Sequence, residues 1–178
     1  LALTLRLTEG LAELEAHTVI QRAELGVAKR LAEATLGLKP EKNVEVYDLS
    51  EEKQDLPRVV LIQGCMTESD SPHSGVSYYG LPVRESLATL VHPNELLDGA
   101  VGVNCTRGVC HHPTTWDWQN HPLVLGLYRE HGRRLNFAGV ILERIRFETH
   151  HGKEVIAHNT AQMGSALRAD GALVTWVG

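Results

Sequence analysis

The sequence has few of the features that mark specialised classes of protein. It contains three cysteines in 178 residues, an odd number without framework spacing, so we do not expect a disulfide-stapled secreted domain. Aromatic residues make up 5%, and no apolar run is long enough to cross a bilayer. The N-terminus shows no secretory signal. These absences favour a protein of the reducing cytoplasm.

Charge of one sign is also not concentrated anywhere. The net charge is −5 and no block of like charge stands out, so neither a nucleic acid nor a membrane is expected as a partner. Hydrophobic residues make up 43%, which suffices for one domain with a core. The chain begins with Leu1 rather than Met. We expect a single α/β domain over 1–178, as a fragment of a longer precursor.

The hydrophobic pattern alternates between strand-like and helix-like segments. Strands are predicted at 1–7, 44–49, 58–64, 99–104, 136–145 and 172–177. Helices are predicted at 11–36, 81–97, 122–131 and 153–168, and a loop over 66–80. Gly132 follows the third helix as a candidate C-cap. This order predicts an α/β fold with a layered parallel, Rossmann-like sheet and helices on both faces.

One segment collects much of the reactive chemistry. The stretch "GVNCTRGVCHHPTTWDWQNHP", residues 102–122, holds two of the three cysteines, three of the ten histidines and two of the three tryptophans. It follows the strand predicted to end at Asn104. Ligand sites of parallel sheets lie beyond the carboxyl ends of the strands, so this is the predicted site.

Two interpretations of the segment use its thiols directly. Zinc would find its ligands among Cys105, Cys110, His111, His112 and His121, but the spacing lacks a C-x-x-C pair, so no metal site is predicted. A redox pair of Cys105 and Cys110 is compatible with the four residues between them. Arg107 would lower a thiol pKa there. The third cysteine, Cys65, follows a strand and is expected as a small buried hydrophobe.

A third interpretation concerns the backbone. The thiol of Cys105 can attack the carbonyl of Asn104 and form a thioester. Elimination and hydrolysis would then leave a pyruvoyl group, whose ketone can bind an amine covalently. An Asn-Cys dipeptide alone is weak evidence for this chemistry, so the residues by themselves leave the three interpretations open.

Longer stretches of the sequence resemble a known family. "HPNELLDGAVGVNC", "TTWDWQNHPLVLGLYREHGRRLNFAGVIL" and "GSALRADGALVT" resemble the precursors of component B of glycine, sarcosine and betaine reductases, a family that includes the D-proline reductase precursor. "AELGVAKRLAEATLG" near the N-terminus is similar as well. The resemblance covers nearly the whole chain.

The resemblance implies a mechanism. Members of the family are cleaved autocatalytically before a cysteine, here Cys105, which becomes a pyruvoyl cofactor; no nucleotide cofactor is implied. The implied partners are a selenocysteine- or cysteine-containing reductase subunit and the other fragment of the same precursor. The implied reaction is reductive cleavage of a C–N bond in a small amino acid or amine.

Further candidate residues surround the dipeptide, each with a structural alternative. Asn104 and Cys110 join Cys105 as catalytic candidates, although Asn104 also suits a turn and Cys110 a packing role. Helix capping is the alternative for the polar residues that precede helices. The substrate-binding candidates are Arg107, Thr114, Thr115, His92, Glu95 and His121.

Two other functional hypotheses remain. The chain would be a non-catalytic scaffold that orders a catalytic partner, or a metal or thiol enzyme that uses Cys105, Cys110 and the nearby histidines.

Overall fold

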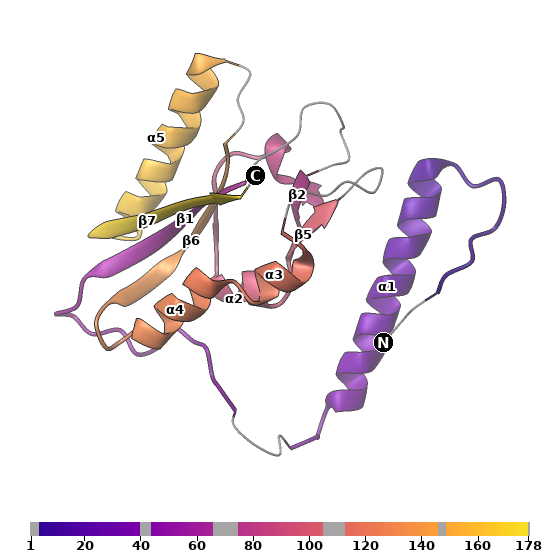
Figure 1. Cartoon of the computed structure of the whole chain (residues 1–178), viewed down its shortest axis with the longest axis horizontal. Coiled ribbons are helices and arrows are strands. Elements are labelled where there is room, and N and C mark those ends of the chain that lie inside the picture. The colour runs from indigo at the N-terminus through magenta and orange to yellow at the C-terminus, as the bar shows by residue number, and fades with distance from the viewer. Residues whose placement is uncertain (1–3, 40–43, 66–74, 105–112, 146–148, 178) are drawn as a thin grey trace. The chain divides into compact units, whose positions relative to one another are not determined.

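The computed structural model describes residues 4–39, 44–65, 75–104, 113–145 and 149–177, with residues 103, 104 and 177 described as backbone only. Figure 1 shows the order of its helices and strands. The chain divides into two compact units, 1–45 and 46–178, and each is considered by itself below. One domain over 1–178 stays a prediction.

The first unit is dominated by the helix α1, Glu13–Thr35, which confirms the helix predicted at 11–36. The carboxylate of Glu15 accepts a hydrogen bond from the Ala12 amide at 3.2 Å and so caps the first turn. Gly37 follows the helix at a φ of +84°. The predicted strand at 1–7 is wrong over its described part, because residues 4–7 form no strand.

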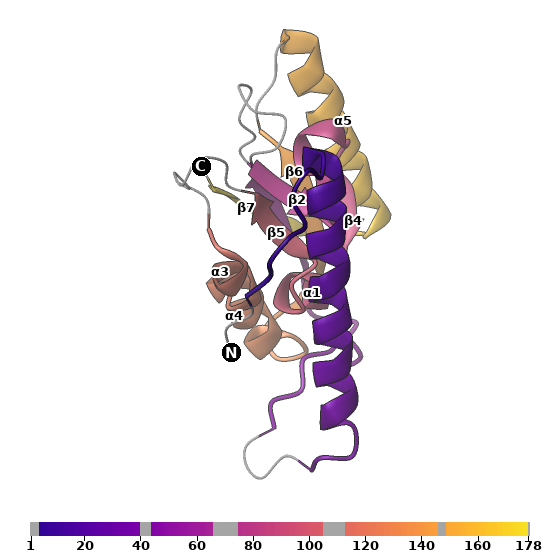
Figure 2. The same ribbon diagram turned by 90° about the vertical axis from the view of Figure 1, so that its right-hand side faces the viewer.

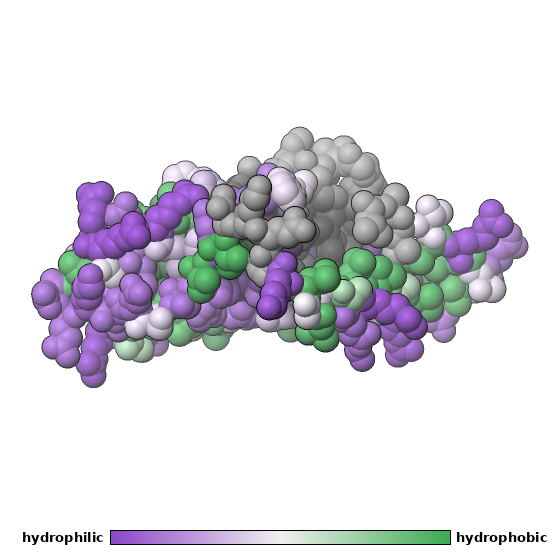
Figure 3. All heavy atoms as spheres, turned by 90° about the horizontal axis from the view of Figure 1, so that it is seen from below, coloured by the Kyte–Doolittle hydropathy of each residue, from purple (hydrophilic) through white to green (hydrophobic). Residues whose placement is uncertain are grey.

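No residue of α1 is buried, and several of its apolar side chains are exposed. Figure 2 shows α1 as a single continuous helix. Figure 3 shows one face of the molecule, on which hydrophobic and hydrophilic residues are interspersed. In a soluble protein an amphipathic helix buries its apolar stripe, so the sequence pattern of α1 is that of a helix with a packing partner.

The second unit is built on a four-stranded sheet of order β4-β6-β1-β7. The strands β1 (Arg58–Cys65), β6 (Asn136–Arg144) and β7 (Gly171–Val177) run parallel, while β4 (Thr89–Val91) is antiparallel to β6. The three predicted apolar strands at 58–64, 136–145 and 172–177 are confirmed. The fold is therefore mixed α/β with a mostly parallel sheet.

Helices pack against this sheet from both sides. On one face, Leu61 and Val140 share a core with Leu96, Trp118 and Val124. Those three side chains come from α2 (Pro93–Leu97), α3 (Thr115–Gln119) and α4 (Pro122–Glu130). On the other face, Val60 and Ile141 pack with Met163 and Leu167 of α5 (His150–Ala166) and its C-cap. The helices predicted at 122–131 and 153–168 are confirmed.

A second sheet is antiparallel and has the order β3-β2-β5. It comprises β2 (Gly75–Tyr78), β3 (Leu81–Pro82) and β5 (Val101–Asn104). The strand predicted at 99–104 is confirmed, but it does not belong to the parallel sheet. The argument that Asn104 ends a parallel strand is therefore wrong, because β5 pairs antiparallel with β2.

Three further element predictions need correction. Residues 44–49 form no strand, and 75–78 of the predicted loop form β2. The helix predicted over 81–97 breaks into β3, the 3-10 turn Val83–Glu85, β4 and α2. Pro82 and Pro93 explain part of this, since neither can donate the backbone hydrogen bond of a helix interior. Pro93 instead begins α2, where its missing N–H costs nothing.

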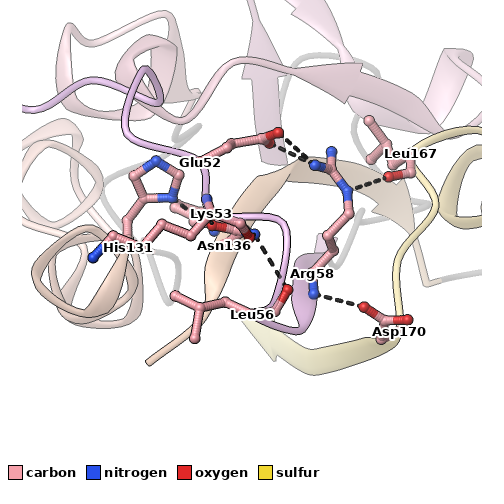
Figure 4. Close-up of polar contacts among 9 residues, drawn as sticks. Glu52, Lys53, Leu56, Arg58, His131, Asn136, Leu167 and Asp170 are labelled. Carbon is pink, nitrogen blue, oxygen red and sulfur yellow. Dashed lines mark hydrogen bonds and ion pairs between the residues drawn. The ribbon is translucent and has the colours of Figure 1, made fainter. Parts of the chain in front are cut away.

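A polar network closes the amino-terminal end of the parallel strands (Figure 4). Arg58 donates from Nη1 to Glu52 at 2.7 Å and from Nε to the Leu167 carbonyl at 2.9 Å. Asn136 accepts from the Lys53 amide at 3.0 Å and donates to the Lys53 carbonyl at 2.6 Å. These bonds tie the segment before β1 to β6 and to the end of α5.

Candidate functional site

Asn104 is the last residue of β5 and lies opposite Gly75, the first residue of β2. The backbone leading to the Asn104–Cys105 peptide bond is thus held in a strand ladder. Five residues singled out in the sequence lie outside the part of the chain that the structure describes: Cys105, Arg107, Cys110, His111 and His112.

Two hydroxyl groups lie beside Gly102 in the middle of β5. A Cβ atom placed on Gly102 would lie 3.6 Å from Ser77 Oγ and 3.9 Å from Thr115 Oγ1. Ser77 is buried and pairs directly with Gly102, while Thr115 is exposed in the first turn of α3. Sequence reasoning predicted Thr115 but missed Ser77, because the segment containing it was expected to be a loop.

Thr114 has the capping role that was considered as its alternative. Its hydroxyl accepts from the Asp117 amide at 3.4 Å, and the Asp117 carboxylate accepts from the Thr114 amide at 2.7 Å. The Thr114 hydroxyl also donates to the Asp117 carboxylate at 2.7 Å, and this bond, followed by the one from the Thr114 amide, lowers the pKa of Asp117. These reciprocal hydrogen bonds between Thr114 and Asp117 form a capping box, which begins α3 and places Thr115 beside β5.

His92 and Glu95 begin α2 in the same way. The Glu95 carboxylate accepts from the His92 amide at 2.8 Å, and His92 Nδ1 accepts from the Asn94 amide at 3.2 Å. Glu95 also accepts from the Tyr78 hydroxyl at 2.5 Å. Burial acts to raise the pKa of Glu95, but hydrogen bonds led by the one from Tyr78 outweigh it and lower that pKa.

The Tyr78–Glu95 pair lies at the opposite end of the ladder from Asn104. Tyr78 pairs with Val101, whereas Asn104 pairs with Gly75, three residues further along each strand. Three residues of a strand span roughly 10 Å. The structure therefore places Glu95 at the start of β5 and Thr115 over its middle.

His121 lies in the core rather than on the surface, with 8% of its area exposed. Its Nδ1 accepts from the Val124 amide at 3.4 Å and caps α4, while Nε2 lies 3.0 Å from Gln63 Oε1. Nε2 must therefore carry the proton that Gln63 accepts. Burial lowers the pKa of His121, which favours this neutral form.

Gln63 is the polar residue of this region that sequence reasoning missed. It is fully buried in β1, on the same face as Leu61 and Cys65. A single amide at a buried position of an apolar strand was the available signal, since such a group needs a hydrogen-bond partner. His121 supplies that partner from a position 58 residues later.

The described part of the chain contains no cluster of three or more histidine, cysteine or acidic side chains able to hold a metal ion. Cys65 is buried at the end of β1, and burial, helped by Glu143, raises its pKa to about 12. It is the inert packing cysteine that the sequence predicted. Among the described helices, none is long and apolar enough to cross a membrane.

The features described so far define a class of protein: a mixed α/β unit in which a strand of a small antiparallel sheet ends at the asparagine of an Asn-Cys dipeptide. The family model described as glycine/sarcosine/betaine reductase component B subunits matches residues 1–178. The chain belongs to this family.

Relatives agree with this assignment. The chain is 32% identical over 154 residues to the betaine reductase complex component B subunit alpha of Peptoclostridium acidaminophilum, covering 83% of the chain and 34% of the relative. It is 29% identical over 175 residues to the sarcosine reductase complex component B subunit alpha of the same organism, covering 94% and 40%.

The glycine reductase complex component B subunits alpha and beta of Acetoanaerobium sticklandii are 28% identical over 176 residues, covering 94% of the chain and 39% of the relative. The chain thus spans between a third and two fifths of the length of these relatives. No solved structure matches.

Proposed function

We propose that this chain is the substrate-activating part of a reductase complex that cleaves a C–N bond of a small amino acid or amine. Cys105 acts either as the precursor of a pyruvoyl group or as a reactive thiol. The observation that carries the proposal is the Asn104–Cys105 bond at the end of β5, within a chain of the component B family. The relatives' names specify glycine, sarcosine and betaine, which supports a small amino acid or amine as the substrate class.

Cleavage at this bond needs no oxidant. Cys105 Sγ attacks the carbonyl carbon of Asn104, the peptide C–N bond breaks, and the amine of Cys105 is released as a thioester forms. Loss of the Cα proton and of the Cβ–S bond releases a thiocarboxylate and leaves dehydroalanine. Its imine tautomer takes up water and loses ammonia, which leaves a pyruvoyl group at the new N-terminus.

The chain's own residues prepare this step. Pairing of β5 with β2 limits the motion of the backbone that ends at Asn104, and an oriented carbonyl is attacked faster than a free one. The hydroxyl groups of Ser77 and Thr115 lie beside Gly102. They suit an uncharged carbonyl group as ligand, because they can donate hydrogen bonds that its oxygen accepts. A pyruvoyl ketone supplies an electrophile for the amine of the substrate.

The partner is a selenocysteine- or cysteine-containing reductase subunit that delivers the electrons, together with the other part of the component B precursor. The named relatives belong to reductase complexes, which supports the existence of partners. We also propose a cytoplasmic location and a layered, Rossmann-like arrangement of the parallel sheet. Packing of helices on both of its faces supports that arrangement.

Mass spectrometry of the purified protein under denaturing conditions tests the proposal. We expect two fragments divided between Asn104 and Cys105, of which the C-terminal one reacts with a hydrazine probe. Cys105→Ala should abolish both the cut and the labelling. Cys110→Ala is the matched control, because it removes the neighbouring thiol, and it should still be cut.

Other results would decide between the remaining hypotheses. An intact chain with a free Cys105 thiol in an active complex would overturn the pyruvoyl mechanism and leave the thiol mechanism. Full activity of Cys105→Ala in the reconstituted complex would favour the scaffold hypothesis. Stoichiometric zinc that is lost in a Cys105→Ala, Cys110→Ala double variant would favour the metal enzyme.

A further inference from the structure

The two edges of the parallel sheet differ in kind. One edge is β4, three residues long and antiparallel to its neighbour. The other is β7, seven residues long and parallel to β1. Proteins protect sheet edges with short strands, charges, proline or bulges, because a long regular edge pairs with other chains. The edge at β4 has this protection through its length alone.

The strand β7 has none of these protections. Its sequence, GALVTWV, contains no charged residue and no proline, and its register with β1 is unbroken from Gly171 to Val177. Such an apolar run is typical of a parallel strand buried on both faces. The strand β7 is therefore built like an interior strand but stands at an edge of the sheet that the described residues form.

Exposure of its side chains leads to the same conclusion. Val174 is 63% and Trp176 68% exposed on the face that carries α5, and Leu173 is 43% exposed on the opposite face. The strand next to it is buried, with Val60 at 1% and Leu61 at 0% exposed. Burial of the β7 side chains would be favourable, because it removes apolar surface from water.

An apolar ledge, formed by Ile145, Val174 and Trp176, runs from the end of β6 across Gly64 of β1 onto β7. Gly64 has no side chain, and a Cβ there would lie 2.5 Å from Ile145 Cγ2 and 3.2 Å from Trp176 Cβ. Ile145 and Trp176 thus approach each other across Gly64, beside Val174. A helix that packs on this ledge would cover Trp176 and Val174 together.

We propose that β7 is an interior strand of assembled component B, and that its free edge and exposed faces are covered by a strand and helix from the rest of component B. The named relatives are roughly two and a half to three times as long as the aligned region, since it covers 34% of one and 40% of the other. That remaining polypeptide supplies an uncharged parallel strand beside β7. This surface does not depend on the chemistry at Cys105.

Hydrogen–deuterium exchange tests the proposal on component B reconstituted from this chain and the polypeptide that corresponds to the remaining part of the relatives. This chain would carry Cys105→Ala both alone and in the assembly, so cleavage does not affect the result. We expect the amides of β7 to exchange at least tenfold more slowly in the assembly than in the chain alone. Equal exchange rates would overturn the proposal.

Substitutions test the same surface through affinity. Val174→Lys places a charge in the strand and should weaken assembly at least tenfold, whereas Val174→Thr keeps a β-branched side chain and should assemble nearly as well as the parent chain. Trp116→Lys is the matched control for Trp176→Lys, because Trp116 is 71% exposed but lies on α3. Unchanged affinity of both the Val174→Lys and the Trp176→Lys variants would contradict the proposal.

A second copy of the chain is the competing occupant of β7. It would appear as a dimer in sedimentation velocity, with β7 amides protected in the chain alone and no further protection on assembly. That result would also overturn the proposal. Circular dichroism of each variant separates lost assembly from lost folding, and the exchange measurement on the parent chain stands even if a variant does not fold.

Discussion

His121 and Gln63 are joined in the core by a hydrogen bond of 3.0 Å between Nε2 and Oε1, across 58 residues of sequence. The bond connects the start of α4 to the middle of β1, so one histidine both caps a helix and satisfies a buried amide. This double role makes the neutral imidazole part of the folded structure, because protonation of Nδ1 would break the cap.

The stability of the protein should therefore depend on pH through His121. Burial lowers its pKa below the ordinary 6.5, so below that pH the unfolded state binds more protons than the folded state. This contribution is complete above pH 6.5 and is lost as the pH falls toward the lowered pKa. His121→Gln should cost about 1–3 kcal/mol at pH 7.5, and the cost should shrink by pH 5.5.

Urea unfolding of both proteins at the two pH values measures this difference. His150→Gln is the control, because the side chain of His150 is 84% exposed at the start of α5. It should leave the unfolding free energy within about 0.5 kcal/mol of the parent protein at both pH values. A cost for His121→Gln that is the same at both pH values would contradict the neutral, buried imidazole.

Gly64 should tolerate no larger side chain. A Cβ there would meet Ile145 at 2.5 Å, Trp176 at 3.2 Å and the Thr175 carbonyl at 3.3 Å. Gly64→Ala should destabilise the protein by about 1–3 kcal/mol in urea unfolding. Gly126→Ala in α4 is the matched control, since nothing lies within 4 Å of its Cβ position. It should stabilise the helix by about 0.5–1 kcal/mol, and equal effects would refute the crowding argument.

Asn136 should be among the most sensitive polar residues for stability. It is 2% exposed and makes side-chain hydrogen bonds of 3.0, 2.6 and 3.2 Å to the backbone of Lys53 and Leu56. Asn136→Ala leaves those groups without their partner and should cost about 2–3 kcal/mol in thermal or urea unfolding.

The matched control for Asn136 is Asn120→Ala. Asn120 is exposed and donates a single hydrogen bond of 2.8 Å to the Trp116 carbonyl. It should cost less than about 1 kcal/mol, because water can replace that bond. If the two variants lose the same stability, the network at the amino-terminal end of the sheet is not what anchors the segment before β1.

Cys65 should be unreactive in the folded protein. It is fully buried and its pKa is raised to about 12, so very little thiolate exists at pH 8. Iodoacetamide at pH 8 should modify Cys65 at least about a hundredfold more slowly in native protein than in 6 M guanidinium, as measured by peptide mass spectrometry. Comparable rates would show that the thiol is accessible, and labelling could then not be assigned to Cys105 or Cys110 alone.

The elements that the sequence predicted correctly have a pattern that needs no distant partner to be recognised. The apolar runs of β1, β6 and β7 and the helical repeats of α1 and α5 are of this kind. Short elements were the errors. The strand β2 has four residues in a Ser- and Gly-rich segment, and it forms because β5 pairs with it from about 25 positions later.

In the candidate site, too, local patterns could be predicted from the sequence and long-range contacts could not. Helix starts are predicted by the Thr-x-x-Asp pattern at Thr114 and by the His-Pro pairs at His92 and His121. Their capping roles could therefore be predicted from the sequence as alternatives. The sequence could not predict that Ser77 lies beside Gly102 or that Gln63 bonds to His121, because each contact joins segments that lie far apart in the chain.

By itself the sequence determined the family and the apolar strands of a mostly parallel sheet, and it predicted the Asn104–Cys105 dipeptide as the bond of interest. Only the tertiary structure decided that β5, which carries Asn104, lies in a separate antiparallel sheet, and that β7 is an apolar strand left at an edge. The physical reason is that a strand's own residues specify its apolar pattern, whereas its neighbours depend on which distant segments bury that pattern.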